Sequence, residues 1–276
     1  MEKEKITSLW NKAAENPQTE KVRGYYLTRL FLIPIEKARK YISKEICIEK
    51  AAPQKNEDKC IRILKADLWN EGVDFERNIL KHLRARKNKL YGIDISLRTC
   101  ILAKENTEGI EVSNGTIDAL AFKDGSFDML LDLSTLDHLP KEKLGTVIAE
   151  YNRVLSPNGT FVLIFDWWGI IWYMYMFYLE RVRGHGDYFF KNTTTPSRYI
   201  HPIRLMKKII TMHGFTIKEE YCLDYTGWMW NRLTKPFWDK VTKNGYEWIL
   251  KIEYSKISKY FKPFAKQYVI IAQKNN

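Results

Sequence analysis

The stretch 89–166 most constrains the fold of this chain, because short apolar runs alternate in it with amphipathic ones. The runs 90–95 and 127–133 have the length and composition of buried strands. The segments 97–105 and 141–155 have the periodicity of helices that bury one face. Strands that alternate with helices indicate βαβ units with right-handed crossovers. The stretch therefore predicts an α/β fold built on a mainly parallel sheet.

The rest of the chain extends this pattern. We predict further strands over 61–67, 110–112, 160–165, 215–224 and 267–273, and further helices over 75–87 and 202–213. Ser96 is predicted as the N-cap of the helix that begins at Leu97, because its hydroxyl can accept from an N–H of the first turn. Gly214 is predicted to close the helix 202–213, and Ser156–Gly159 to form a turn.

The N-terminal region is predicted to form a separate helical cap. Residues 1–55 are rich in Lys, Glu and Arg around aromatic anchors at helical spacing, with a helix that ends near Pro34. A polar run that follows Pro53 indicates a linker. We therefore expect a cap over 1–55 and one domain over 56–276.

Composition describes a folded, basic protein with 45% hydrophobic and 28% charged residues. The 45 Lys and Arg exceed the 33 Asp and Glu, which gives a net charge of +12. This excess favours an anionic partner or surface, and a solvated basic surface explains it equally well. The four cysteines form no Cys-x-x-Cys pair, which favours reduced thiols in a cytoplasmic protein without a metal site. The N-terminus lacks the apolar core of a signal peptide.

An aromatic insertion follows the predicted strand 160–165. The run 167–179 is apolar almost throughout and is followed by Arg181 and Arg183. It is too short to cross a bilayer, which takes about 20 helical residues. We expect 167–200 and 225–262 to form a lid over an apolar acceptor, or an anchor near anionic headgroups. An extra core layer against the N-terminal helices is an equally good interpretation.

Acidic residues follow two neighbouring predicted strands. Ligands of open α/β sheets bind beyond the carboxyl ends of the strands. Asp94 has this position, and its two acceptor oxygens can bind both hydroxyls of a ribose. Asp118 comes after the next strand, where a carboxylate can accept from an adenine amino group, and Ala119 can offer its backbone N–H to a ring nitrogen. Together these residues predict a nucleoside site.

Four segments carry a resemblance to a known family: Gly92–Ser96, Asp118–Asp128, Leu136–Pro140 and Arg153–Thr160. With them the chain resembles the class I, Rossmann-like S-adenosylmethionine-dependent methyltransferases. The resemblance covers about residues 60–166 well and the last two strands loosely. It implies a three-layer fold with helices on both faces of a seven-stranded sheet whose last strand is antiparallel.

The resemblance also implies a cofactor, S-adenosylmethionine, and residues that bind it. Asp94 is expected on the ribose and Asp118 at the adenine. Ile95, beside Asp94, and the pair Asp132 and Leu133, at the end of the fourth strand, complete the expected contacts.

The sequence departs from the family after the first strand. Family members usually carry a Gly-x-Gly-x-Gly loop there, which lets the backbone approach the cofactor. The corresponding stretch is Asp-Leu-Trp-Asn-Glu-Gly. Asp67, Asn70 or Glu71 could pair with the cofactor's ammonium, and Lys65 could reach its carboxylate. Trp69 could place an aromatic face near the sulfonium. The alternative is a widened loop that binds nothing.

Methyl transfer from a sulfonium demands alignment and a competent nucleophile. His138, after the fourth strand, is the first candidate for a base, with Asp137 beside it; His201 and His185 follow. A structural role for His138 in the turn is the alternative. No Asn-Pro-Pro-Tyr or Asp-Pro-Pro-Tyr follows this strand, a motif that serves amino methylation in similar enzymes. An oxygen or carbon acceptor is therefore favoured.

These features support three interpretations. The first is a methyltransferase that acts on a small, apolar or lipid-like acceptor, with peripheral contact to an anionic membrane. The second is a binding or regulatory protein that has lost transfer activity through its altered first loop. The third is an RNA methyltransferase, suggested by the net charge, although no separate RNA-binding module is visible. No DNA partner is expected, and the oligomeric state stays open.

Overall fold

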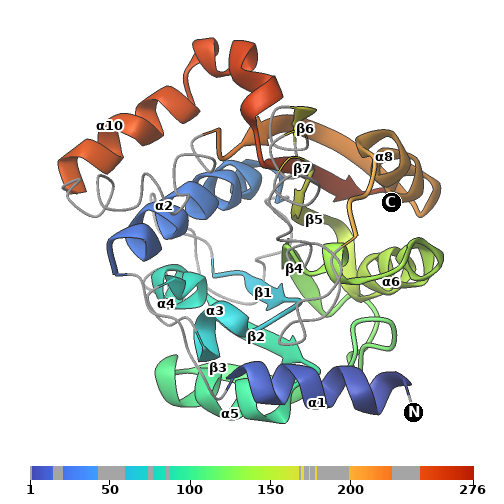
Figure 1. The fold of residues 1–276 in the computed structure, drawn as a ribbon. Helices are drawn as coiled ribbons and strands as arrows, with labels where there is room; N and C mark the ends of the chain where they lie inside the picture. Colours follow the sequence, from blue (N-terminus) through green and yellow to red (C-terminus); the bar gives the residue numbers. More distant parts are fainter. Residues whose placement is uncertain are drawn as a thin grey trace, which may run out of the picture.

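A computed structural model describes residues 2–14, 21–42, 60–73, 77–84, 88–167, 169–170, 174, 178, 199–225 and 243–276. Within this part of the chain, a seven-stranded sheet lies between two layers of helices (Figure 1). The strands are β1 (Arg62–Lys65), β2 (Lys89–Asp94), β3 (Ile110–Asn114), β4 (Phe127–Leu133), β5 (Leu155–Asp166), β6 (Phe215–Leu223) and β7 (Gln267–Lys274).

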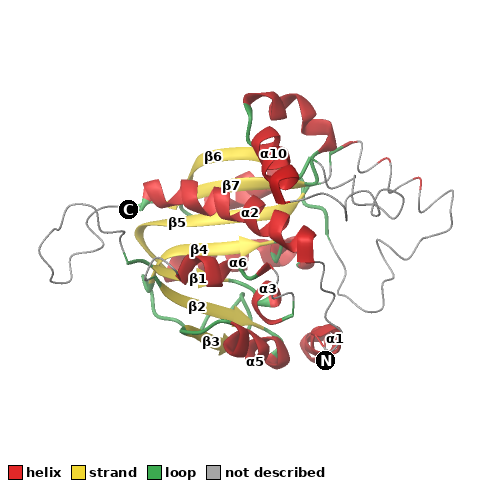
Figure 2. Cartoon of the chain, turned by 90° about the vertical axis from the view of Figure 1, so that its left-hand side faces the viewer, coloured by secondary structure: helices red, strands yellow, loops and turns green. Residues whose placement is uncertain are grey.

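The order of the strands confirms the predicted α/β topology. They are arranged β3-β2-β1-β4-β5-β7-β6, as Figure 2 shows from bottom to top. Strands β3, β2, β1, β4 and β5 pair in parallel, and β7 is antiparallel to both β5 and β6. The chain therefore has the three-layer, Rossmann-like fold with a seven-stranded sheet and an antiparallel last strand.

Helices cover both faces of the sheet. One face is packed by α2 (Lys21–Ala38), α4 (Ile79–Arg84), α5 (Leu97–Asn106) and α10 (Lys243–Glu253), and the other by α6 (Lys141–Val154) and α8 (Ile203–Met212). Shorter elements are α3 (Trp69–Gly72) and the 3-10 helices η1 (Arg39–Tyr41), η4 (Leu136–His138) and η6 (Lys256–Phe264). The remaining helix, α1 (Glu2–Ala14), lies alongside α5, outside the two layers (Figures 1 and 2).

The core follows from the apolar patterns of these elements. Helix α6 buries residues spaced by three or four positions, which form one face: Leu144, Val147, Ile148, Tyr151 and Val154. Strand β4 is buried at every position, as expected for a central strand covered on both sides. The predicted caps are confirmed as well, because Ser96 accepts from the Thr99 N–H at 3.1 Å and Gly214 has a φ of +81° after α8.

Three predicted boundaries differ from the structure. Strand β1 ends at Lys65, two residues early, because the chain turns into α3. Pro34 lies inside α2, which continues to Ala38, and the burial of Ile35 and Ala38 favours this continuation despite the missing N–H. Strand β5 begins at Leu155, so the predicted turn 156–159 is an irregular start of the strand, with a shift of register against β4.

The predicted division at residue 55 falls outside the described residues, and so does most of the predicted lid. Helix α2 packs directly on the sheet, where Leu30 and Ile35 are fully buried in the same core as β4, β5 and β7. The Tyr26 hydroxyl donates to Glu253 Oε1 of α10 at 3.1 Å. Helix α2 thus forms part of the layer that covers one face, together with α10.

Candidate active site

Asp94 lies at the carboxyl end of β2 and joins the loops that follow β1 and β2. Its Oδ2 accepts from the Leu68 N–H at 2.9 Å, and its Oδ1 accepts from the Ser96 N–H at 2.8 Å. Burial raises the pKa of this carboxyl to about 6, although both backbone N–H groups lower it. Each oxygen uses one of its lone pairs in these bonds. The carboxylate therefore keeps acceptor capacity for the two hydroxyls of a ribose, and it fits the expected role.

The loop between β3 and β4 carries the residues expected at the adenine. Asp118 is partly exposed, and one of its oxygens lies 3.8 Å from Lys143 Nζ of α6. The Ala119 N–H donates to the Thr116 carbonyl at 3.3 Å, a long bond inside the turn. Ile95, next to Asp94, is partly buried, and its carbonyl accepts from Asn114 Nδ2 at 3.1 Å. The structure thus places Asp118, Ala119 and Ile95 in the loops that follow the neighbouring strands β2 and β3.

Two residues of α6 hold this loop in position, and no sequence pattern predicts a role for either. The Arg153 guanidinium donates to the carbonyls of Leu120 and Phe122, each at 2.8 Å. Glu150 Oε2 accepts from the Leu120 N–H at 2.8 Å and also pairs with Arg153. Although Arg153 belongs to a segment that carried the resemblance, its partners lie about 30 residues away, so its role required the folded chain.

Replacing Arg153 with alanine is expected to loosen the loop 118–124 and to weaken adenosine binding about threefold to tenfold, because hydrogen bonds from a charged group are lost. Hydrogen exchange of the loop and calorimetric titration with S-adenosylmethionine measure both effects. Arg84→Ala is the matched control, because Arg84 pairs with Glu108 on an exposed surface, where the expected change is below about 1 kcal/mol. Equal protection of the loop in Arg153→Ala and wild type would contradict the assignment.

The loop after β1 is filled by a buried ion cluster. The Lys65 ammonium lies 3.0 Å from Glu71 Oε2 and 3.2 Å from Asp67 Oδ1, and it donates to the Asp67 carbonyl at 2.7 Å. The side chains of Lys65 and Glu71 are fully buried. Burial alone would lower the pKa of Lys65, but the charges of Asp67 and Glu71 outweigh it and raise this pKa to about 12. Lys65 therefore binds its own loop, with three partners around its ammonium.

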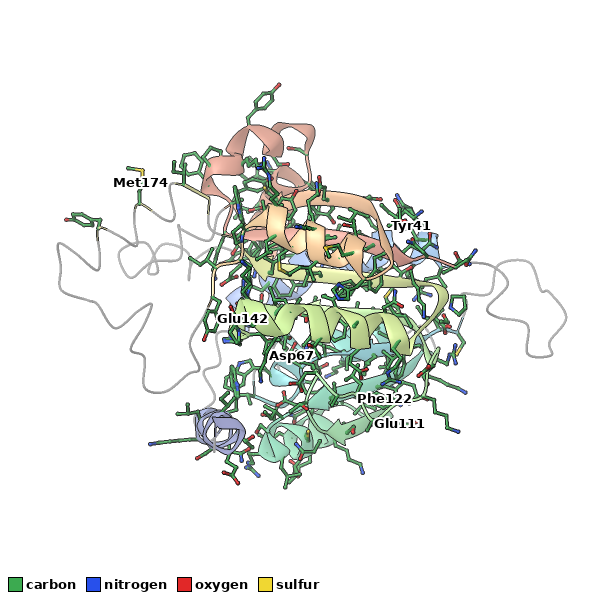
Figure 3. The ribbon with its side chains drawn as sticks, turned by 90° about the vertical axis from the view of Figure 1, so that its right-hand side faces the viewer. Tyr41, Asp67, Glu111, Phe122, Glu142 and Met174 are labelled. Atoms are coloured by element: carbon green, nitrogen blue, oxygen red, sulfur yellow. The ribbon has the colours of Figure 1, made fainter. Side chains whose placement is uncertain are left out.

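The remaining side chains of this loop differ in accessibility. Asn70 and Glu71 are buried, and Glu71 also accepts from the N–H groups of Ile79 and Leu80. Asp67 retains 18% exposure, and its Oδ2 accepts from the Thr135 hydroxyl at 3.0 Å. Among the acidic groups of this loop, Asp67 is thus the one placed to meet a cofactor ammonium. Figure 3 shows Asp67 at the edge of the sheet that faces α1.

Helix α1 brings two residues to this edge that the sequence did not indicate. The Trp10 ring packs edge to face against Trp69 and His138, with centroid distances of 5.3 and 5.1 Å. Next to it, Asn11 Oδ1 accepts from the Ser96 hydroxyl at 2.6 Å. Trp10 is one of the aromatic residues that the helical spacing of 1–55 predicts as anchors, but no local pattern places α1 across the ends of β1, β2 and β4.

The end of β4 is organised around Asp132. This carboxylate is fully buried, accepts from the Tyr151 hydroxyl at 2.8 Å, and accepts from the Thr135 N–H at 2.9 Å. Burial raises its pKa to about 6. Leu133 is also buried, and Ser134 adopts a φ of +70°, which is uncommon for a residue other than glycine. Asp132 therefore holds the turn 134–138 through its bond to Thr135, and the buried Leu133 anchors the start of this turn in the core.

The candidate bases lie on or beside η4. His138 meets Trp10, and the adjacent Asp137 is buried with a backbone carbonyl that accepts from the Tyr199 N–H. His201 is buried, and its Nε2 lies 3.0 Å from the Leu139 carbonyl. Because burial lowers the pKa of His201 and a carbonyl only accepts, Nε2–H donates to the turn. His201 is thus placed to position η4, and His185 lies outside the described residues.

The pKa of Asp94 predicts how cofactor binding changes with pH. Because ribose hydroxyls donate to the ionised carboxylate, the affinity is expected to reach its plateau about one pH unit above the pKa of about 6. Below pH 6 the carboxyl is mostly protonated and must lose its proton before both oxygens can accept from the ribose. The affinity should therefore fall by up to about tenfold per pH unit. Calorimetric titration with S-adenosylmethionine between pH 5 and pH 8 measures this dependence. Asp94→Asn should remove the dependence near pH 6, and a variant that keeps it would assign the titration to another group.

The chain is similar to known methyltransferases in part of its sequence and in its fold. The order and directions of the strands define a Rossmann-like fold, with acidic residues beyond β2 and β3. Residues 76–163 match the family model described as a methyltransferase domain. Residues 76–163 therefore resemble a methyltransferase domain in sequence, and the fold of the chain is that of class I, Rossmann-like methyltransferases.

Solved structures and one curated protein share this fold or part of the sequence. A geranyl diphosphate C-methyltransferase from Streptomyces coelicolor is 13% identical, with a TM-score of 0.55 and coverage of 99% of this chain and 98% of that chain. An S-adenosylmethionine-dependent methyltransferase from Methanosarcina mazei is 19% identical, with a TM-score of 0.50 and coverage of 80% and 94%.

The curated match is shorter. An uncharacterised protein of Haemophilus influenzae is 36% identical over 89 residues, which are 32% of this chain and 30% of that protein. The chain therefore matches less than a third of the length of this relative.

The described residues contain neither a helix fit to span a membrane nor a cluster of metal-binding side chains. In the ranges given above, no helix is long and apolar enough to cross a membrane. Among the same residues, no group of three or more His, Cys, Asp or Glu side chains could hold a metal ion.

Proposed function

We propose that this protein transfers a methyl group from S-adenosylmethionine to an oxygen or carbon atom of a small, apolar or lipid-like acceptor. The observation that carries the proposal is the position of three side chains. Asp94, Asp67 and His138 lie at or just beyond the carboxyl ends of β2, β1 and β4. The methyltransferase-domain match over 76–163 supports it. The fold is also that of a geranyl diphosphate C-methyltransferase, which is compatible with an apolar acceptor.

Each residue of the site has a role in this proposal. Asp94 accepts from the ribose hydroxyls, and Asp118 and the Ala119 N–H read the adenine. Asp67, fixed by the Thr135 hydroxyl, accepts from the cofactor's ammonium. Trp69 faces the sulfonium, where an aromatic ring stabilises positive charge. The cluster of Lys65 and Glu71 holds the loop, in place of the usual glycines.

The cofactor supplies an electrophilic methyl group bound to positively charged sulfur. The acceptor atom would form a bond to the methyl carbon while the sulfur–carbon bond breaks. The electron pair of the broken bond would stay on sulfur, which becomes neutral. An acceptor hydroxyl or carbon acid also loses a proton, and His138 is the group we assign to take it. His201 contributes indirectly, because its hydrogen bond to the Leu139 carbonyl fixes the turn that carries His138.

Exposed apolar side chains near this edge support a lipid-like acceptor taken from a membrane surface. Ile170, Met174 and Tyr178, spaced by four residues, are 63%, 60% and 47% exposed. In Figure 3, Met174 lies at the outer upper left of the molecule, and Asp67 lies nearer its centre. Co-sedimentation with anionic vesicles across a salt series tests this contact. No binding at low salt would leave only a small acceptor in solution.

Calorimetric titration of the full chain with S-adenosylmethionine tests the proposal first. No binding at high protein concentration would overturn it. The second step is transfer of a labelled methyl group to a cell extract, followed by partition. Label in small apolar or lipid molecules is expected, whereas label in RNA or protein would contradict the acceptor class.

A second candidate is a binding protein without transfer activity. It is favoured by the first loop, which Lys65, Glu71 and Trp69 fill where glycines usually give the backbone access. Cofactor binding without transfer to any fraction of the extract would support this alternative.

A further inference from the structure

Helix α1 lies across the site at three points. Trp10 contacts Trp69 of the loop after β1 and His138 of the turn after β4. Asn11 binds Ser96, two residues beyond Asp94 in the loop after β2. Figure 2 shows α1 beside α5, at the end toward which β4 points. The helix therefore contacts the loops after β1, β2 and β4, three of the four strands whose loops the proposed function assigns to the cofactor and its acceptor.

The contact through Asn11 is a partly buried hydrogen bond to a buried serine. Ser96 is fully buried, donates its hydroxyl proton to Asn11 Oδ1, and accepts from the Thr99 N–H that begins α5. Asp94 accepts from the Ser96 N–H in the same loop. A single serine thus connects α1 to both the helix cap and the ribose-binding carboxylate, so the position of Trp10 is coupled to the adenosine end of the site.

The rings of Trp10, Trp69 and His138 form an aromatic wall between the ends of β1 and β4. A sulfonium attached to a ribose at Asp94, with its ammonium at Asp67, would lie in front of this wall. Aromatic faces attract a cation through their quadrupole, and tryptophan does so most strongly. The product of methyl transfer has the same adenosine and amino-acid groups, but its sulfur is a neutral thioether. The wall therefore acts on the positive charge, which the cofactor carries and its product lacks.

We propose that Trp10 of α1 completes the cofactor site, and that its ring makes the site prefer the cationic cofactor over the neutral product S-adenosylhomocysteine. This inference rests on the proposed function, because it requires that S-adenosylmethionine binds at Asp94. Its consequence is that product leaves readily once the charge on sulfur has been transferred with the methyl group.

Titration of four full-length variants with both ligands tests the proposal. Trp10→Ala is expected to lower the affinity for S-adenosylmethionine about threefold to tenfold, and to change that for S-adenosylhomocysteine by less than about twofold. Trp10→Phe keeps an aromatic face and should retain most of the preference. Lys12→Ala, an exposed residue of the same helix, should leave both affinities unchanged.

Asn11→Ala tests the docking of the helix. It weakens the contact of α1 with Ser96 but keeps the Trp10 ring, so the preference for S-adenosylmethionine should fall less than in Trp10→Ala. Equal losses for both ligands in Trp10→Ala would overturn the proposal and assign Trp10 to packing alone, as would unchanged affinities. Wild-type protein that binds neither ligand would overturn the proposed function as well, which distinguishes the two failures.

Discussion

Replacing Asp94 with alanine is expected to weaken S-adenosylmethionine binding by about a hundredfold or more. The ribose hydroxyls would lose two hydrogen bonds to a charged acceptor, each worth about 1.5–3 kcal/mol, and about 1.4 kcal/mol corresponds to tenfold in affinity. The carboxylate also joins two loops through the Leu68 and Ser96 N–H groups, so the alanine variant loses preorganisation as well. Calorimetric titration measures the affinity, and urea unfolding measures the accompanying loss of stability.

Asp128 provides the matched control for this variant. It is a buried aspartate at the opposite end of β4, where it accepts from the Arg62 guanidinium at 2.8 Å and from the Arg62 N–H at 2.8 Å. Asp128→Ala should destabilise the fold without changing cofactor affinity. If both aspartate variants weakened binding equally, the loss would come from the fold, and the ribose assignment would be wrong.

Replacing Lys65 with methionine is expected to destabilise the folded protein by about 3–5 kcal/mol. The substitution leaves the Glu71 carboxylate fully buried without its cation, and burial already raises the pKa of Glu71. Two backbone N–H groups, from Ile79 and Leu80, would still bind this carboxylate, but neither carries a charge. Urea unfolding, with the free energy extrapolated to water, measures the effect.

The double variant Lys65→Met, Glu71→Gln removes both charges and keeps an acceptor oxygen for these N–H groups. It is expected to recover most of the lost stability, because an uncharged side chain has a much smaller cost of burial. Lys207→Met, in a half-exposed pair with Glu220, should cost less than about 1 kcal/mol. A double variant no more stable than the single one would show that Lys65 acts through packing and not through its charge.

The parts of the fold that depend on local patterns could be predicted from the sequence. Strand β4 and the helix cap at Ser96 are confirmed residue by residue, because an uninterrupted apolar run and a capping serine act over a few positions. Pro34 shows the limit of such rules. A proline usually ends a helix, yet packing of Ile35 and Ala38 against the sheet favours a continued helix.

The first loop shows why site chemistry was harder to predict. The sequence shows that the loop lacks the Gly-x-Gly-x-Gly pattern, and it predicts that Lys65 reaches the carboxylate of the cofactor. Whether a lysine points into a ligand site or into the loop depends on which carboxylates the fold brings near it. Here Glu71 turns inward on α3 and lies 3.0 Å from the ammonium. The sequence distance of six residues gives no indication of this direction.

The contact of α1 with the site could not be predicted, because it joins distant parts of the chain. Trp10 and His138 are far apart in the sequence, and the stretch between α1 and α2 falls outside the described residues. Helical periodicity predicts that Trp10 is an anchor, but it does not predict which surface receives it. Such contacts arise from packing of whole elements, which a single sequence does not specify locally.

Gly72, the one glycine left in the first loop, has a different partner from the one that the family pattern suggests. A Cβ at this position would lie 2.6 Å from the Thr99 carbonyl and 3.3 Å from the Ala103 N of α5. The residue therefore works as a spacer, which lets α3 and α5 cross almost backbone to backbone. Trp69 begins α3 and Ser96 caps α5. The distance at which the two helices cross therefore sets the distance between the loops after β1 and β2. A larger residue at position 72 would alter that distance without touching any ligand.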